Sequence, residues 1–126
     1  MKPIIILKSV ILFLAISVSA IAQQECDYEI PAEIQKYLDK SRDTKKYESA
    51  ERLGFLEKAL EEDPKCLPCL MRIGEMEFLL AKRSGGSFAP AEKYFEELAS
   101  LCENYHSEMY YFLGAMYYAD RQYGKA

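Results

Sequence analysis

One short pattern occurs twice in this chain and constrains its fold more than any other feature. Residues 70–74 place an apolar residue, a second apolar residue three positions later and then glycine, and residues 110–114 repeat that order with tyrosine first. Around both segments apolar residues recur at helical spacing, whereas no stretch alternates convincingly with the period of two typical of strands. Glycine inside a helix costs about 0.5 to 1 kcal/mol relative to alanine, so Gly74 needs a packing reason. The pattern predicts an all-α chain.

Apolar periodicity and the breaks between segments predict five helices. They are expected at about 31–42, 44–62, 67–82, 90–102 and 107–120, and residues 121–126 are expected to form a turn and the opening of a further helix. Pro31 and Pro90 suit opening turns, and Pro64 ends the second segment because proline lacks a backbone N–H. The Ser-Gly-Gly-Ser sequence at 84–87 predicts a plain linker, since a phosphate-binding loop would need a GxxxxGK[ST] pattern after a strand.

The first 22 residues have the features of a signal peptide. Two lysines flank a short basic start, residues 10–18 are apolar, and residues 19–22 supply the small residues that signal peptidase recognises. An uncleaved membrane anchor is the alternative, but the apolar run is shorter than the roughly 20 residues that span a bilayer. Cys26 does not follow the small apolar residues that lipidation needs. The sequence therefore predicts export and cleavage.

Length and charge limit what the mature chain can be. Cleavage after residue 22 would leave 104 of the 126 residues, enough for one small core, and we expect a short lead at 23–30 and one helical domain at 31–126. Two of the 16 basic residues lie in the leader, so the mature chain would carry 14 basic and 20 acidic residues, a net charge of −6. Duplex nucleic acids require concentrated positive charge, so nucleic acid is excluded as a partner.

From about residue 44 to residue 126 the chain resembles the tetratricopeptide repeat (TPR) family. The two glycine steps match the first helix of that repeat, Ala91-x3-Phe95 matches its second helix, and Pro64 matches its closing proline. Glu77 departs from the pattern, which prefers tyrosine there. The resemblance implies a short α-solenoid of stacked antiparallel helix pairs that approach closely at the glycine. It also implies a scaffold that binds a protein or peptide partner without catalysis.

In the TPR family, residues of each first helix line a concave groove. Carried onto this chain, the resemblance assigns partner binding to Met71, Glu75, Phe78, Leu79, Tyr111, Ala115, Tyr118 and Ala119. This apolar set with a single acid suits an extended or helical peptide with apolar anchors. The alternative is that Phe78, Leu79 and Tyr118 pack on neighbouring helices.

The last expected helix carries an apolar face without a successor. A repeat buries this face against the next repeat, or ends in a polar capping helix. Tyr110, Leu113, Tyr117 and Tyr118 would therefore lack packing partners, which indicates the N-terminal piece of a longer protein; a truncated reading frame and a partner's helix are the alternatives. A signal peptide before a short TPR array is similar to Gram-negative envelope proteins that continue into β-propeller and peptidoglycan-binding OmpA-like domains, including type IX secretion proteins. We expect the protein in the periplasm or at the outer membrane.

Four cysteines in an exported chain predict disulfides, and three pairings are possible. If the helices stack as in the TPR family, Cys26, Cys66, Cys69 and Cys102 all lie at one edge of the array. That arrangement favours the pairs Cys26–Cys66 and Cys69–Cys102.

The same cysteines raise other hypotheses. Cys66-Leu67-Pro68-Cys69 matches the C-x-x-C pattern of thiol-disulfide oxidoreductases, but the strand that precedes it in thioredoxin-like enzymes is missing. Zinc would need all four cysteines without a recognised spacing, and a c-type haem would need histidine at Leu70. His106 is the single histidine and is expected in a solvated turn. We therefore expect no catalytic residue, no metal and no cofactor.

Overall fold

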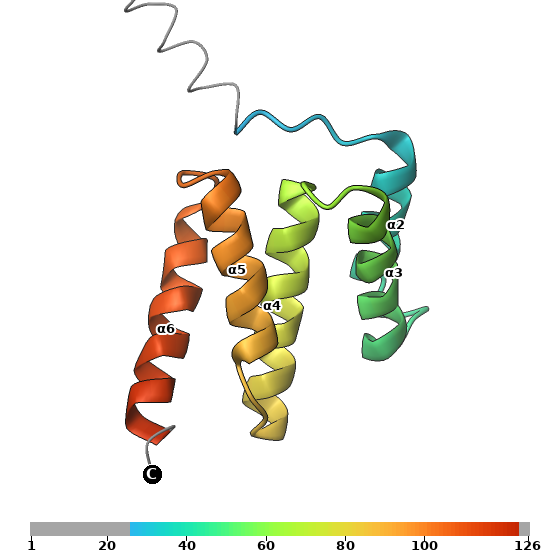
Figure 1. The fold of residues 1–126 in the computed structure, drawn as a ribbon. Coiled ribbons are helices and arrows are strands. Elements are labelled where there is room, and N and C mark those ends of the chain that lie inside the picture. The colour runs from blue at the N-terminus through green and yellow to red at the C-terminus, as the bar shows by residue number, and fades with distance from the viewer. Residues whose placement is uncertain (1–25, 124–126) are drawn as a thin grey trace, which may run out of the picture.

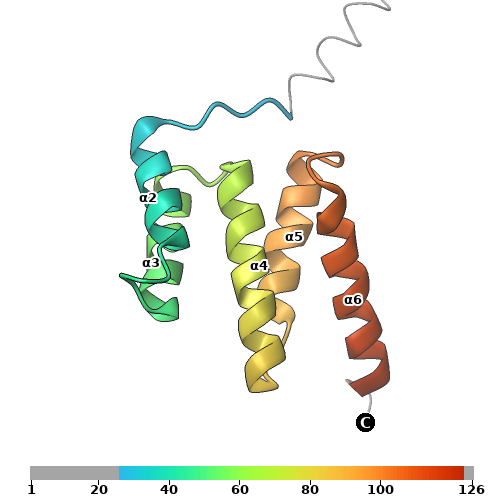
Figure 2. The same ribbon diagram turned by 180° about the vertical axis from the view of Figure 1, so that it is seen from behind.

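The computed structural model describes residues 26–123, and α-helices are the regular secondary structure in this range. The helices are α2 (Ala32–Arg42), α3 (Ser49–Glu62), α4 (Leu67–Ser84), α5 (Ala89–Leu101) and α6 (Ser107–Tyr123), and this range contains no strand. Consecutive helices run in opposite directions, with α2 and α3 on one side, α4 and α5 in the middle and α6 on the other side (Figures 1 and 2). The all-α prediction is confirmed, while the leader predicted at 1–22 lies outside the described residues.

Two helix boundaries differ from those predicted by three residues or more, and the others agree within two residues. Helix α3 was expected from residue 44, but the side chain of Asp43 accepts hydrogen bonds from the backbone N–H groups of Lys45 and Lys46 at 3.2 and 3.0 Å, which holds a turn there. The turn predicted from residue 121 is also wrong, because α6 continues to Tyr123. Residues 121–123 carry no helix-breaking feature, so the helix continues through them, and the further helix expected to open by residue 126 lies outside the described residues.

Helix α4 begins and ends at residues with identifiable caps. At its start the sulfur of Cys66 accepts a hydrogen bond from the backbone N–H of Cys69 at 3.2 Å, and Pro68 occupies the first turn. At its end Gly85 adopts φ 70°, the left-handed conformation that favours glycine after a helix. Gly85, in the predicted linker at 84–87, therefore ends α4.

Helix α4 is the central element because it contributes to both hydrophobic clusters. The cluster toward α2 and α3 consists of Ile34, Leu38, Leu56, Ala59, Cys66, Cys69, Ile73 and Met76. The cluster toward α5 and α6 consists of Leu67, Leu70, Met71, Phe78, Ala91, Phe95, Leu98, Cys102, Met109, Leu113 and Met116. Leu113 is thus buried, contrary to the expectation that it lacks a packing partner. The reason is that it faces α5, not the outer side of α6.

Gly74 of α4 lies against the side chain of Phe95 of α5. A Cβ atom added at this glycine would lie 2.8 Å from Cζ of Phe95 and 3.0 Å from both Cε atoms. Phe95 is fully buried, and its ring stacks on Phe112 with a centroid distance of 5.2 Å and an interplanar angle of 11°. The packing reason predicted for Gly74 is confirmed, because the Phe95 ring occupies the space of the missing side chain.

The disulfide pairing differs from the favoured prediction. Cys26 is bonded to Cys102 and Cys66 to Cys69, with Cα–Cα distances of 5.2 Å in both pairs. The lead before α2 crosses the ends of the helices and reaches the end of α5, which brings Cys26 to Cys102 (Figures 1 and 2). Cys66 and Cys69 are three residues apart at the start of α4, within bonding distance of one another. The Cys66–Cys69 pair therefore follows from the short separation of the two cysteines along the chain.

The lead is also attached near its middle. The Tyr28 hydroxyl donates a hydrogen bond to the Asp63 carboxylate at the end of α3. Partial burial, that hydrogen bond and the Asp63 charge all raise the pKa of Tyr28 above its ordinary value.

Among residues 26–123, no helix has both the length and the apolar character needed to cross a membrane.

Candidate functional site

The predicted groove is partly filled by the protein's own core. Met71 and Phe78 are buried, at 7% and 9% exposure, in the cluster toward α5 and α6. The Phe78 ring lies 5.0 Å from that of Phe112 and 5.4 Å from that of Phe88. The core therefore covers most of both side chains and leaves little of either for a partner. The alternative, in which Phe78 packs on neighbouring helices, is correct.

The remaining predicted residues do not form one groove. Glu75, Ala115 and Ala119 are half-buried, whereas Leu79, Tyr111 and Tyr118 are exposed. Leu79 lines a cavity beside α3, while the two tyrosines lie on α6 at the opposite side of the molecule (Figure 1). The structure thus offers two separate surfaces where the sequence predicted one.

The cavity at Leu79 combines basic and apolar side chains. It has a volume of about 170 Å³, and we call it the arginine cavity. Its lining residues come from the α2–α3 turn, α3 and α4, and are Thr44, Ser49, Arg52, Arg72, Met76, Leu79, Leu80 and Arg83. Three guanidinium groups and no carboxylate line it, in a chain whose net charge is negative.

Two of these arginines converge on the end of α2. Arg52 Nη1 and Arg72 Nη2 each lie 3.5 Å from the carbonyl oxygen of Ser41, one of the carbonyls that a helix end leaves without an intrahelical partner. Arg72 also lies 3.6 Å from the carboxylate of Glu75. The Nε atoms of Arg52 and Arg72 are buried and have no hydrogen-bond partner within residues 26–123. Because these Nε atoms are enclosed, a partner at the cavity can reach only the Nη atoms of the two arginines.

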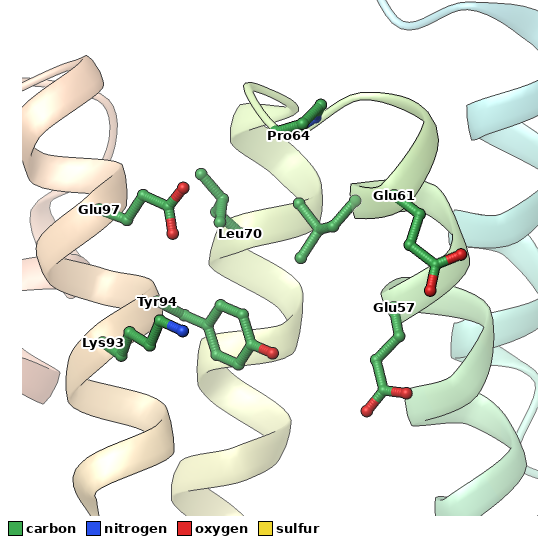
Figure 3. Close-up of a pocket in the computed structure, with 8 residues that line it drawn as sticks. Glu57, Glu61, Pro64, Leu70, Lys93, Tyr94 and Glu97 are labelled. Atoms are coloured by element: carbon green, nitrogen blue, oxygen red, sulfur yellow. The ribbon is translucent and has the colours of Figure 1, made fainter.

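A second depression lies between α3, α4 and α5 and is more acidic. Its volume is about 370 Å³, and Figure 3 shows Glu57 and Glu61 of α3 on one wall and Lys93, Tyr94 and Glu97 of α5 on the other. Burial raises the pKa of Tyr94, and the Glu57 charge raises it further. Within the described part of the chain, no group of three histidine, cysteine or acidic side chains is placed to hold a metal ion. The charged side chains of this depression therefore do not form a metal-binding group.

The Cys66–Cys69 disulfide is enclosed by the core. Both cysteines have no exposed surface and pack within the cluster toward α2 and α3. Thiol-disulfide exchange requires attack on an accessible sulfur. Burial therefore favours a structural role over the oxidoreductase role that the C-x-x-C pattern raised.

His106 is exposed, and its Nδ1 accepts the backbone N–H of Glu108 at 3.2 Å.

Two polar contacts join α5 to α6. A hydrogen bond with Asp120, together with burial and the charges of Asp120 and Glu96, raises the pKa of Glu92 to about 7. The Tyr117 hydroxyl donates to Glu96 Oε1 at 2.7 Å, and this bond, with burial and nearby carboxylates, raises the pKa of Tyr117 to about 12. The sequence contained no signal for either pair, because their contacts depend on how α6 packs on α5.

The arginine cavity was also missed at the sequence level, although part of it had a signal. Arg72, Met76, Leu79 and Arg83 follow one another at spacings of four, three and four residues, which places them along one side of α4. That stripe mixes basic and apolar residues, and so differs from the apolar stripes expected of a core. Arg52 lies on another helix and could be added only by the structure.

Similarity to known proteins does not identify the chain. A comparison with protein-family models finds none that matches, and comparisons with curated proteins and with solved structures likewise find no match. The resemblance to TPR repeats therefore depends on the residue pattern from 44 to 126 alone.

Proposed function

We propose that the protein is an exported scaffold that binds a segment of another protein and has no catalytic activity of its own. The observation that carries this proposal is the arginine cavity, where three guanidinium groups lie beside exposed aliphatic surface. The partner segment that fits it has an apolar side chain next to a carboxylate.

The chemistry of the cavity supports this partner class. A guanidinium group binds carboxylates through two parallel N–H bonds, and three such groups, those of Arg52, Arg72 and Arg83, line the cavity. Met76, Leu79 and Leu80 supply an apolar wall, and Leu79 is 45% exposed. The volume of about 170 Å³ is below the 300 to 1,000 Å³ of typical small-molecule pockets. It suits one anchoring side chain of a larger partner.

The helical arrangement and the disulfides support the rest of the proposal. Antiparallel neighbouring helices, with Gly74 against Phe95, are consistent with TPR-like helix pairs. Disulfides form and persist in oxidising compartments, which agrees with export. We place the scaffold in the periplasm, in solution or associated with the outer membrane.

A peptide selection tests the binding role. The purified, oxidised protein is immobilised and used to select from a displayed library of random peptides, whose enriched members are then measured by fluorescence anisotropy. We expect peptides that combine an acidic residue with an apolar neighbour. Combining Leu79→Ala with Arg83→Gln is expected to weaken their binding at least about tenfold, since it removes both kinds of contact.

A matched variant controls for general surface effects. Ile30 is 39% exposed and lies outside the cavity, and Arg121 is exposed near the end of α6. Ile30→Ala with Arg121→Gln makes the same two chemical changes and is expected to leave binding unchanged. Failure to enrich any peptide over an uncoated surface would refute the binding role, and equal losses in both variants would refute the cavity as its site.

A further inference from the structure

Helix α6 presents four exposed tyrosines around a glycine. Tyr110, Tyr111, Tyr117 and Tyr118 are 49%, 70%, 49% and 66% exposed. Gly114 lies between them in sequence, and a Cβ atom placed there would meet nothing within 4 Å. We call these five residues the tyrosine face. Helix α6, which carries this face, stands at the end of the row of helices away from α2 and α3 (Figures 1 and 2).

The tyrosine face is symmetric about Gly114. The tyrosines stand three and four residues before the glycine and three and four residues after it. At about 100° per residue, Tyr110 and Tyr117 lie to one side of Gly114, and Tyr111 and Tyr118 lie to the other side by similar angles. Rotation of the helix by 180° about a line across its axis through Gly114 therefore reproduces the same pattern. Such a face can complement a copy of itself.

We propose that the tyrosine face is a self-association surface, on which a second copy of this chain docks with its α6 antiparallel to the first. A two-fold axis beside Gly114 would place Tyr110 against the partner's Tyr117, and Tyr111 against the partner's Tyr118. Two-fold interfaces of this kind use the same patch on both copies. Tyrosine is enriched at protein interfaces because its ring is apolar and its hydroxyl remains solvated.

Charge favours the antiparallel arrangement over the parallel one. Arg121 lies two turns after Gly114 on the same side of α6 and is exposed. A parallel pair would bring Arg121 against its own copy, whereas an antiparallel pair brings it to the partner's Ser107. The helix dipoles also oppose each other in the antiparallel pair. The tyrosine face itself contains no charged residue, so the negative net charge of the chain is not concentrated at the contact.

The packing inside the protein shows that a helical glycine can accept an aromatic ring closely. On α4, Gly74 is covered by the ring of Phe95, and its neighbours Met71 and Phe78 are buried. The corresponding residues around Gly114 are Tyr111 and Tyr118, which are exposed. The surface around the glycine is thus covered on α4 and exposed on α6. In the antiparallel register a second α6 places its own Gly114 opposite this one, and its tyrosines pack above and below the two glycines.

Two of the tyrosines are already held in position. The Tyr117 hydroxyl is bonded to Glu96 at 2.7 Å, and the Tyr111 ring lies edge-on to Phe112 at a centroid distance of 5.6 Å. Side chains that are ordered before association lose less conformational entropy on binding. With these contacts in place, Tyr117 is still 49% exposed and Tyr111 70% exposed.

The exposed area predicts a weak dimer. The four exposed fractions, applied to roughly 200 Å² per aromatic side chain, leave about 470 Å² per copy. Two copies would bury about 900 Å², which is below the roughly 1,200 Å² at which stable interfaces begin. The expected dissociation constant is therefore in the micromolar range. This surface is distinct from the arginine cavity, so self-association and peptide binding can succeed or fail independently.

Sedimentation velocity of the purified protein tests the proposal, over concentrations from about 1 μM to 1 mM that cover weak interfaces. We expect a monomer–dimer equilibrium. Gly114→Glu would place two carboxylates against each other at the two-fold axis and is expected to raise the dissociation constant at least about tenfold. Gly54→Glu is the matched control, because Gly54 is also a helical glycine with nothing within 4 Å. It is expected to leave the constant unchanged.

Each other outcome contradicts the proposal. A monomer at every concentration refutes self-association, and equal effects of the two glutamates refute the tyrosine face as its site. Orientation is tested by mixing Tyr111→Cys with an affinity-tagged Tyr118→Cys variant and adding a short bis-maleimide. The four native cysteines are disulfide-bonded, so only the introduced thiols react. Absence of the mixed crosslink would refute the antiparallel arrangement.

Discussion

Gly74 provides the most direct test of how α4 packs against α5. In Gly74→Ala, the new Cβ atom would lie 2.8 Å from the tip of the Phe95 ring, a distance that real Cβ atoms essentially never show. Phe95 cannot move away easily, because it is fully buried and stacked on Phe112. Overpacking of this kind costs about 1 to 3 kcal/mol. Against that, alanine is favoured over glycine in a helix by about 1 kcal/mol.

The two effects are separated by comparison with Gly54→Ala. Gly54 lies inside α3 with nothing within 4 Å of an added Cβ, so only the gain in helix propensity operates there. We expect Gly54→Ala to stabilise the protein by up to about 1 kcal/mol and Gly74→Ala to destabilise it or leave it unchanged. The difference between the two variants should equal the overpacking cost of about 1 to 3 kcal/mol, or roughly 4 to 8 °C in melting temperature per kcal/mol.

The assay is urea unfolding followed by circular dichroism, with the disulfides intact. A double-mutant cycle with Phe95→Leu adds a specific readout, because shortening this side chain removes the atoms that the new Cβ would meet. Gly74→Ala should therefore cost less in the Phe95→Leu background than in the native protein. Equal stability changes for Gly54→Ala and Gly74→Ala would refute the packing of Phe95 on Gly74.

Three further predictions concern ionisation and the disulfides. Because the pKa of Glu92 is about 7 in the folded protein and near 4.5 when unfolded, the folded state binds the extra proton between these values, and the free energy of unfolding falls as pH rises from 4.5 to 7. Glu92→Gln should remove this dependence. We expect it to stabilise the protein at pH 8 by about 1 kcal/mol, a value reduced for screening by solvent, and to change the stability little at pH 4. Urea unfolding at both pH values measures the two effects. Non-reducing tryptic digestion should release the peptide 66–72 unlinked and about 2 Da lighter than its reduced form, whereas the pairing first favoured would join it to two other peptides. Replacing Cys26 and Cys102 together by alanine should lower the free energy of unfolding by about 2 to 5 kcal/mol, measured by the same urea melts, since that bond closes a loop spanning 76 positions.

The sequence by itself determined the helical class of the chain and most helix boundaries. Apolar periodicity separates the helical segments, and the residues that interrupt helices are local signals: Pro64 follows the end of α3, Gly85 ends α4 and Pro90 opens α5. Such signals act through backbone sterics and a missing N–H, so they operate without reference to the rest of the fold. Gly74 was readable in the same way, because an unfavourable residue inside a helix requires compensation by packing.

The tertiary structure decided which side chains meet. The sequence could not show that the lead crosses to Cys102, that Met71 and Phe78 are buried, or that Arg52 joins the arginines of α4. Each of these depends on the position of one helix relative to another, which is set by the combined packing of many side chains and not by a local spacing. For the same reason, the spacing of the tyrosines on α6 was visible in the sequence, but their exposure was established only by the way α6 packs against α5.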